Sequence, residues 1–176
     1  MIVVVGTSAS GKSECADYLA KLGYHKIGAS AYTIRHVDQT LGFFEHREAW
    51  RAVLEEKGFD YATRCALEDL NRLPTQPKKI VIEGIRTWED INLLKQRGPI
   101  VVIGIWRAAE AAYEHARQRR RDDAPHSFEE YVRGAAFEYS LGLGRVLYAA
   151  DHILVNTGDI SELTRTLLEC VQGNNP

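Results

Sequence analysis

The stretch that decides the fold is residues 2–13, which read IVVVGTSASGKS. Four β-branched residues predict a buried strand, and the eight residues after them match the pattern GxxxxGK[ST] in full. In this pattern the glycines let consecutive backbone N–H groups point inward at phosphate oxygens, and the helix that follows adds favourable partial charge. Lys12 would reach the β and γ phosphates of a nucleotide, and the Ser13 hydroxyl would join the shell of Mg²⁺. We therefore expect a site for a nucleoside triphosphate rather than a chance Gly/Ser turn with a solvated lysine.

Length and composition are those of an ordinary globular chain. The 176 residues suit one compact domain, residues 1–176, in which 45% of the residues are apolar and 26% are charged. The net charge of −2 gives no support for general nucleic-acid binding, which normally needs a strongly basic surface. We expect a small-molecule partner and a monomer or homodimer.

The cysteines and the apolar runs indicate the compartment. Cys15, Cys65 and Cys170 form no CxxC pair and are odd in number, which argues against a disulfide framework or a zinc site and favours a reducing compartment. No apolar run approaches the roughly 20 residues that span a bilayer. We expect no signal peptide, because the first strand begins at residue 2, and we expect a cytoplasmic protein.

Short runs of Val and Ile alternate with helical stretches along the chain. Strands are expected at residues 2–5, 24–27, 79–82, 100–105 and 152–155. Their continuous apolar pattern is typical of parallel strands that are buried on both faces. Helices are expected at residues 12–22, 31–40, 47–57, 61–73, 89–96, 108–120, 128–149 and 161–171, with a bend at residues 142–144. The pattern predicts an α/β fold with a five-stranded parallel sheet and helices on both sides.

The motifs favour a small-molecule kinase over a GTP switch. A switch carries the strings NKxD and DxxG, and neither occurs here. A kinase needs a second anion pocket, an acidic residue at a strand end and arginines that converge on the transferring group. Arg35 follows the second expected strand, and Glu83 and Arg86 follow the third, at the edge where ligands of parallel sheets gather. Glu83 would orient Mg²⁺ or its waters, and Arg86 would hold an acceptor phosphate.

An arginine run ends one of the expected helices. Residues 117–121 contain four arginines, and such a run taken alone is usually a solvated helix face. Beside a phosphate-binding loop we interpret it as cationic cover for the triphosphate. It would belong to a short lid at residues 119–127.

Five segments, in this order, resemble the P-loop nucleoside and deoxynucleoside monophosphate kinase-like family, which is related to dephospho-CoA kinase and adenylate kinase-like proteins. They are GTSASGKS (6–13), SAYTIR (30–35), EGIR (83–86), RRRDD (119–123) with Arg133, and ADHILVNTGDISEL (150–163). The resemblance implies a three-layer P-loop kinase fold with a helical acceptor-side insertion at residues 43–75 and the short lid.

The motif and the resemblance together assign the site residues. The catalytic residues would be Lys12, Arg86, Arg119 and Arg121, and the metal would be held by Ser13 and Glu83. ATP would be bound by Gly6, Ser8, Ala9, Ser10, Gly11, Lys12, Ser13, Cys15, Arg119, Asn156 and Gly158. The acceptor would be bound by Arg35, Arg47, Arg64, Glu83, Arg86 and Arg133.

The acceptor side allows two interpretations. Arg47 and Arg64 are candidates to bind the acceptor, and Trp50 is a candidate to stack on its base. The alternative is an amphipathic helix pair with Trp50, Val53 and Leu54 in a small core and the arginines in water.

The sequence therefore predicts an ATP- and Mg²⁺-dependent kinase with a small nucleotide-like acceptor. The first acceptor class is a nucleoside or deoxynucleoside monophosphate, whose anionic oxygen needs no strong base. The second is a hydroxyl, as in dephospho-CoA or a modified nucleoside, for which Glu83 rather than Asp38 would act as the base. A third interpretation of the protein's function is a nucleotide-binding regulatory module that hydrolyses ATP slowly.

Overall fold

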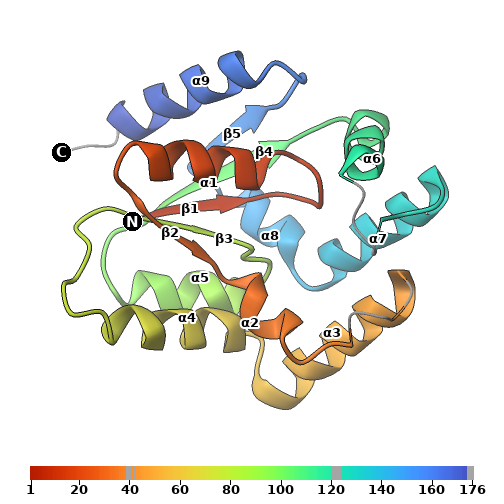
Figure 1. The fold of residues 1–176 in the computed structure, drawn as a ribbon, viewed down its shortest axis with the longest axis horizontal. Helices are drawn as coiled ribbons and strands as arrows, with labels where there is room; N and C mark the ends of the chain where they lie inside the picture. The colour runs from red at the N-terminus through yellow and green to blue at the C-terminus, as the bar shows by residue number, and fades with distance from the viewer. Residues whose placement is uncertain (39–40, 42, 120–123, 174–176) are drawn as a thin grey trace.

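A five-stranded parallel sheet forms the centre of the molecule in the computed structural model, which describes residues 1–38, 41, 43–119 and 124–173 (Figure 1). The strands are β1 (Ile2–Val5), β2 (His25–Gly28), β3 (Ile80–Glu83), β4 (Val101–Trp106) and β5 (His152–Val155), in the spatial order β2-β3-β1-β4-β5. The expected α/β class and parallel sheet are confirmed. Because β1 is central, the loop that follows it leaves from the middle of the carboxyl edge.

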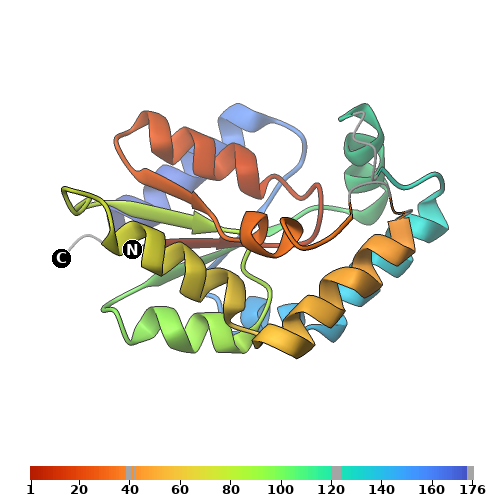
Figure 2. The ribbon, with the colours of Figure 1, turned by 60° about the horizontal axis from the view of Figure 1, so that its bottom comes forward.

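Helices cover both faces of the sheet and extend beyond its carboxyl edge (Figures 1 and 2). They are α1 (Lys12–Lys21), α2 (Ser30–Ile34), α3 (Phe43–Lys57), α4 (Tyr61–Asn71), α5 (Trp88–Lys95), α6 (Ala109–Gln118), α7 (Phe128–Ser140), α8 (Leu143–Tyr148) and α9 (Ile160–Gly173). Ile2 and Val4 enter the core under α1 and α9, whereas Val3 and Val5 enter the core under α4, α5 and α8. Both faces are thus buried, which explains the unbroken apolar pattern of β1.

A third, smaller core lies away from the sheet. It contains Val37, Trp50, Val53, Leu54 and Leu141. α3 and α7 pack against each other here and form a wall beyond the sheet edge (Figure 2). Of the segment expected as an acceptor-side insertion, residues 43–75, α3 belongs to this wall and α4 belongs to the sheet layer.

Two expected helices differ most from the observed ones. The stretch 128–149 is divided into α7 and α8, because Gly142 takes a left-handed φ of 109° between them. This break lies within the bend expected at residues 142–144. The helix expected at residues 31–40 is shorter, since α2 ends at Ile34 and Val37 turns into the third core. Within the described ranges, no helix is long and apolar enough to cross a membrane.

A buried cap fixes the backbone that follows β3. The Thr87 hydroxyl oxygen accepts a hydrogen bond from the Asp90 N–H at 3.1 Å, and the Asp90 carboxylate accepts one from the Thr87 N–H at 3.3 Å. Burial raises the pKa of Asp90. This capping box starts α5 immediately after Arg86, so it determines where the Arg86 side chain leaves the backbone.

We expect Thr87→Val to lower the free energy of unfolding by about 1–2 kcal/mol, because valine keeps the shape but cannot cap α5. Urea unfolding followed by circular dichroism measures this loss. The control is Thr164→Val, which removes a hydroxyl that bonds only backbone carbonyls of α9 and should change stability by less than about 0.5 kcal/mol. Equal losses in the two variants would contradict the role of the cap.

Candidate functional site

The phosphate loop, residues 6–13, has a backbone shape that only certain residues permit. Gly6 and Gly11 have φ values of 151° and 111°, and Ala9 has a φ of 59°. A Cβ atom on Gly6 would lie 2.4 Å from the Ile105 carbonyl oxygen, and one on Gly11 would lie 2.5 Å from Asn156 Nδ2. Both glycines are therefore required by left-handed backbone and by close contact, as the motif predicts.

The loop after β5 supports the phosphate loop from the side. Asn156 Nδ2 donates to the Ser10 carbonyl at 2.8 Å, and its Oδ1 accepts from the Gly158 N–H at 3.0 Å. Asn156 is 7% exposed, so these bonds are shielded from water. Asn156 and Gly158, which were expected to bind the nucleotide, lie at the Ser10–Gly11 end of the loop.

Lys12 is folded into the loop that it follows. Its Nζ donates to the Thr7 carbonyl at 2.6 Å, and the residue is 9% exposed. Burial lowers the pKa of Lys12 from 10.5 to about 8, and the nearby Arg86 and Arg119 also lower it. Glu138 and Glu83 act in the opposite direction. The ammonium group is thus a desolvated cation in a setting where an anion would stabilise it.

Ser13 and Glu83 meet at the carboxyl edge of the sheet. The Ser13 hydroxyl donates to Glu83 Oε2 at 2.9 Å, and Lys26 Nζ lies 3.1 Å from Glu83 Oε1. Hydroxyl and carboxylate oxygens are ligands that suit Mg²⁺, which usually keeps several waters and bridges to phosphate. The two residues therefore fit the metal role. Among the described residues there is no cluster of three or more His, Cys, Asp or Glu that could hold a metal by itself.

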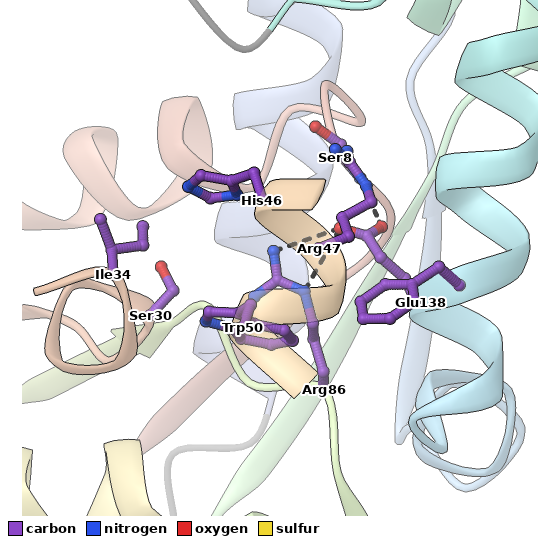
Figure 3. Close-up of a pocket in the computed structure, with 9 residues that line it drawn as sticks. Ser8, Ser30, Ile34, His46, Arg47, Trp50, Arg86 and Glu138 are labelled. Carbon is purple, nitrogen blue, oxygen red and sulfur yellow. Dashed lines mark hydrogen bonds and ion pairs between the residues drawn. The ribbon is translucent and has the colours of Figure 1, made fainter. Parts of the chain in front are cut away.

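A pocket lies beside the loop, between the sheet edge and the α3–α7 wall (Figure 3). It is lined by Ser8, Ser30, Ile34, His46, Arg47, Trp50, Arg86, Phe137 and Glu138. The Arg86 guanidinium stacks on Trp50, with its Cζ 4.7 Å from the ring centroid. Trp50 is 8% exposed and belongs to the third core, so it forms the wall of the pocket rather than a free stacking surface. Arg47 and Arg86 are the expected acceptor-binding arginines that line this pocket.

Glu138 is the central residue that the sequence did not predict. It comes from α7 and is 4% exposed. Its Oε2 accepts from the Ser8 N–H at 2.8 Å, and its Oε1 accepts from Arg86 Nε and Nη2, both at 3.2 Å. The Glu138 carboxylate thus bridges the phosphate loop and Arg86 (Figure 3).

A second group of charges lies on the other side of the loop. Arg119 pairs with Glu14 of α1, and His115 Nε2 lies 3.5 Å from the same Glu14 carboxylate. Burial lowers the pKa of His115, and Arg119 adds to the effect. Arg107 contacts His115 and lies beside Gly158. Arg119 is therefore close to the loop, as expected. The sequence did not predict Arg107. The one sequence feature that points to it is its position just after an expected strand.

Several expected site residues lie elsewhere. Arg35 stacks on Tyr32 and lines a different cavity between β2, α2 and α4, because it is one helical step from Ile34, which faces the site pocket. Arg64 pairs with Asp60 at 3.2 Å.

Two other expected residues lie outside the lining of the pocket beside the phosphate loop. Arg133 is exposed on α7. Cys15 is fully buried in the core under α1, where burial raises its pKa to about 12. Arg121 falls outside the described residues, as do residues 120–123 of the expected lid.

Comparison with known proteins connects the chain to relatives without a stated activity. No family model matches it. It is 26% identical over 168 residues to a UPF0200 protein from Staphylothermus marinus, covering 94% of this chain and 87% of the relative. It is 28% identical over 174 residues to a UPF0200 protein from Pyrococcus abyssi, covering 95% and 92%.

The fold is similar to that of solved structures that include a shikimate kinase and a gluconokinase. The chain matches a shikimate kinase from Acinetobacter baumannii, in complex with shikimate, with a TM-score of 0.62 and 16% identity over 99% of this chain and 93% of that one. It matches a gluconokinase from Sinorhizobium meliloti with a TM-score of 0.58 and 16% identity over 98% and 91%. TT1252 from Thermus thermophilus matches with a TM-score of 0.63 and 21% identity over 99% and 97%. At these identities the likeness establishes the fold alone.

The lowered pKa of Lys12 predicts how stability depends on pH. Below pH 8 the amine is charged in both the folded and the unfolded chain, so the folded protein carries the full cost of burying it. Between pH 8 and 10.5 the folded protein loses the proton first, so its stability rises with pH. We expect Lys12→Met to stabilise the protein at pH 7 by about 2 kcal/mol, with an advantage that shrinks as pH approaches 10.5.

Chemical unfolding of both proteins at pH 7 and pH 10 measures this difference. A Lys12→Met variant that is less stable than the wild type at pH 7, by an amount independent of pH, would contradict the desolvated state of Lys12.

Proposed function

We propose that the protein is an ATP- and Mg²⁺-dependent phosphotransferase that moves the γ-phosphoryl group of ATP to a small acceptor. The observation that carries this proposal is the position of Ser8, which belongs to the phosphate loop and also lines the neighbouring pocket. A donor in the loop and an acceptor in the pocket would therefore meet at one residue. The similarity of the fold to shikimate kinase and gluconokinase supports this interpretation.

The donor side would act mainly through charge and position. The loop amides and Lys12 would bind the phosphate tail, and Arg119 lies where it adds positive charge. Mg²⁺, held with Ser13 and Glu83, would neutralise charge on the phosphates. The acceptor oxygen would form a bond to the γ phosphorus while the bond to the bridging oxygen of ADP breaks.

The first acceptor class that we propose is a nucleoside or deoxynucleoside monophosphate. Arg47, Arg86 and His46 line the pocket and supply groups that bind phosphate oxygens. A phosphate nucleophile is already anionic, so orientation by these side chains would be sufficient for transfer. The product would be a nucleoside diphosphate.

A hydroxyl acceptor is the second candidate. Two proteins of similar fold are named for shikimate and gluconate, and both of these compounds carry hydroxyl groups. The Glu83 carboxylate, which the sequence suggested as a base, is engaged with Ser13 and Lys26 on the donor side. A hydroxyl would therefore be oriented by the pocket residues around Arg86, and its proton would pass to an oxygen of the transferred phosphoryl group as the new bond to phosphorus forms.

The proposal predicts turnover that depends on an acceptor. ATP consumption should be measured with MgATP alone, with each common nucleoside and deoxynucleoside monophosphate, and with shikimate, gluconate or dephospho-CoA. We expect at least about tenfold stimulation by one class, and loss of that activity in Lys12→Ala. A diphosphate product identifies the first class and a phosphomonoester the second. Equal, slow hydrolysis with every compound would instead indicate a nucleotide-binding regulatory module.

Arg86→Lys should weaken use of the acceptor more than binding of ATP. Lysine keeps the positive charge beside Glu138 but loses the planar fork that binds two oxygens at once. We expect kcat/KM for the acceptor to fall by about tenfold or more, while the Kd of ATP changes by less than about threefold. The control is Arg51→Lys, since Arg51 stacks on Phe137 and does not line the pocket. A large loss of ATP affinity in Arg86→Lys alone would contradict the acceptor assignment.

A further inference from the structure

A side-chain carboxylate accepts a hydrogen bond from one of the backbone amides of the phosphate loop. Glu138 Oε2 accepts from the Ser8 N–H at 2.8 Å, and Oε1 accepts two hydrogen bonds from Arg86. Backbone amides and a guanidinium are the groups that usually bind a phosphate. Glu138 therefore uses the donors that a phosphate in this place would use.

The position of this carboxylate is fixed by α7. Tyr131, seven residues before Glu138 and hence on the same helix face, donates its hydroxyl hydrogen to the Ser8 carbonyl at 2.9 Å. α7 thus holds the Ser8 residue by both its N–H and its C=O. Because α7 binds Ser8 through both backbone groups, the packing of α7 fixes the position of the Glu138 carboxylate.

The hydrogen bond between Ser8 and Glu138 lies at the opposite end of the phosphate loop from Ser10 and Gly11. Asn156 and Gly158, which the sequence assigns to ATP binding, lie at the Ser10–Gly11 end, whereas Ser8 lines the pocket where the proposed function puts the acceptor. A donor bound in this direction extends its phosphate tail towards Ser8. The terminal phosphate of a triphosphate would come closest to the Ser8 amide, and a diphosphate would end before it.

We infer that Glu138 competes with the terminal phosphate of the donor for the Ser8 amide, and thereby sets the relative affinity for ATP and ADP. This inference rests on the proposed function, because the placement of the acceptor beside Ser8 sets the direction of the donor. A triphosphate has to displace the Glu138 carboxylate and overcome repulsion from its charge. A diphosphate leaves the carboxylate in place, so Glu138 disfavours ATP selectively.

The test is nucleotide binding to Glu138→Gln, measured by titration calorimetry with MgATP and MgADP. Glutamine keeps the size of the side chain but removes the charge and weakens its hold on the Ser8 N–H and on Arg86. We expect the ratio of the Kd of ADP to the Kd of ATP to rise by about tenfold or more, mainly through tighter binding of ATP. The control is Glu129→Gln, an equal change of charge at an exposed position of the same helix, which should leave the ratio unchanged.

The outcomes separate this inference from the proposed function. If Glu138→Gln changes both affinities equally or neither, Glu138 is only structural and the inference is wrong, while the donor site stands. If the wild type binds neither nucleotide, the proposed function and the inference fail together.

A measurement on the wild type covers the case in which the variant does not fold. MgATP should shift the amide resonance of Ser8 in a ¹⁵N–¹H spectrum by displacing its carboxylate partner, and MgADP, which leaves that partner in place, should shift the resonance much less. Equal shifts with the two nucleotides would overturn the inference.

Discussion

The site depends on the bent backbone of the phosphate loop. Left-handed conformations at Gly6, Ala9 and Gly11 turn the chain sharply between β1 and α1. Two of these positions lie so close to Ile105 and Asn156 that a side chain would collide. The loop is therefore shaped both by its own sequence and by the ends of β4 and β5. A helix amino terminus with inward amides is a natural anion site, and the surrounding side chains are arranged around it.

The charges near this loop are paired across elements that are distant in sequence. Arg86 on the β3 side pairs with Glu138 of α7, and Arg119 after α6 pairs with Glu14 of α1. Charges at partly or fully buried positions are costly unless they have partners, so these acids keep the cations folded inward. An anionic substrate would meet cations that are already in position, but it would have to compete with the carboxylates that hold them.

The fold and the shape of the loop after β1 could be predicted from sequence because their signals are local. The residues 2–13 contain a strand, a glycine-rich loop and a helix start in immediate succession, and the structure forms all three. The contacts in the pocket beside this loop could not be predicted in the same way. Glu138 is an ordinary acid within a helix, and its meeting with Ser8 depends on the packing of α7, which no short motif encodes. Arg35 and Ile34 are adjacent in the chain but face different cavities, a difference that depends on where α2 ends.

The separate core behind the pocket has a consequence for how such proteins diversify. α3 is anchored through Trp50, Val53 and Leu54 to a small cluster of its own, apart from the two cores that cover the sheet. Substitutions in its pocket-facing positions therefore alter the pocket beside the phosphate loop without disturbing the sheet or the loop after β1. On the proposed function, selection could exchange one acceptor for another by changing this outlying helix, while the nucleotide site is inherited unaltered.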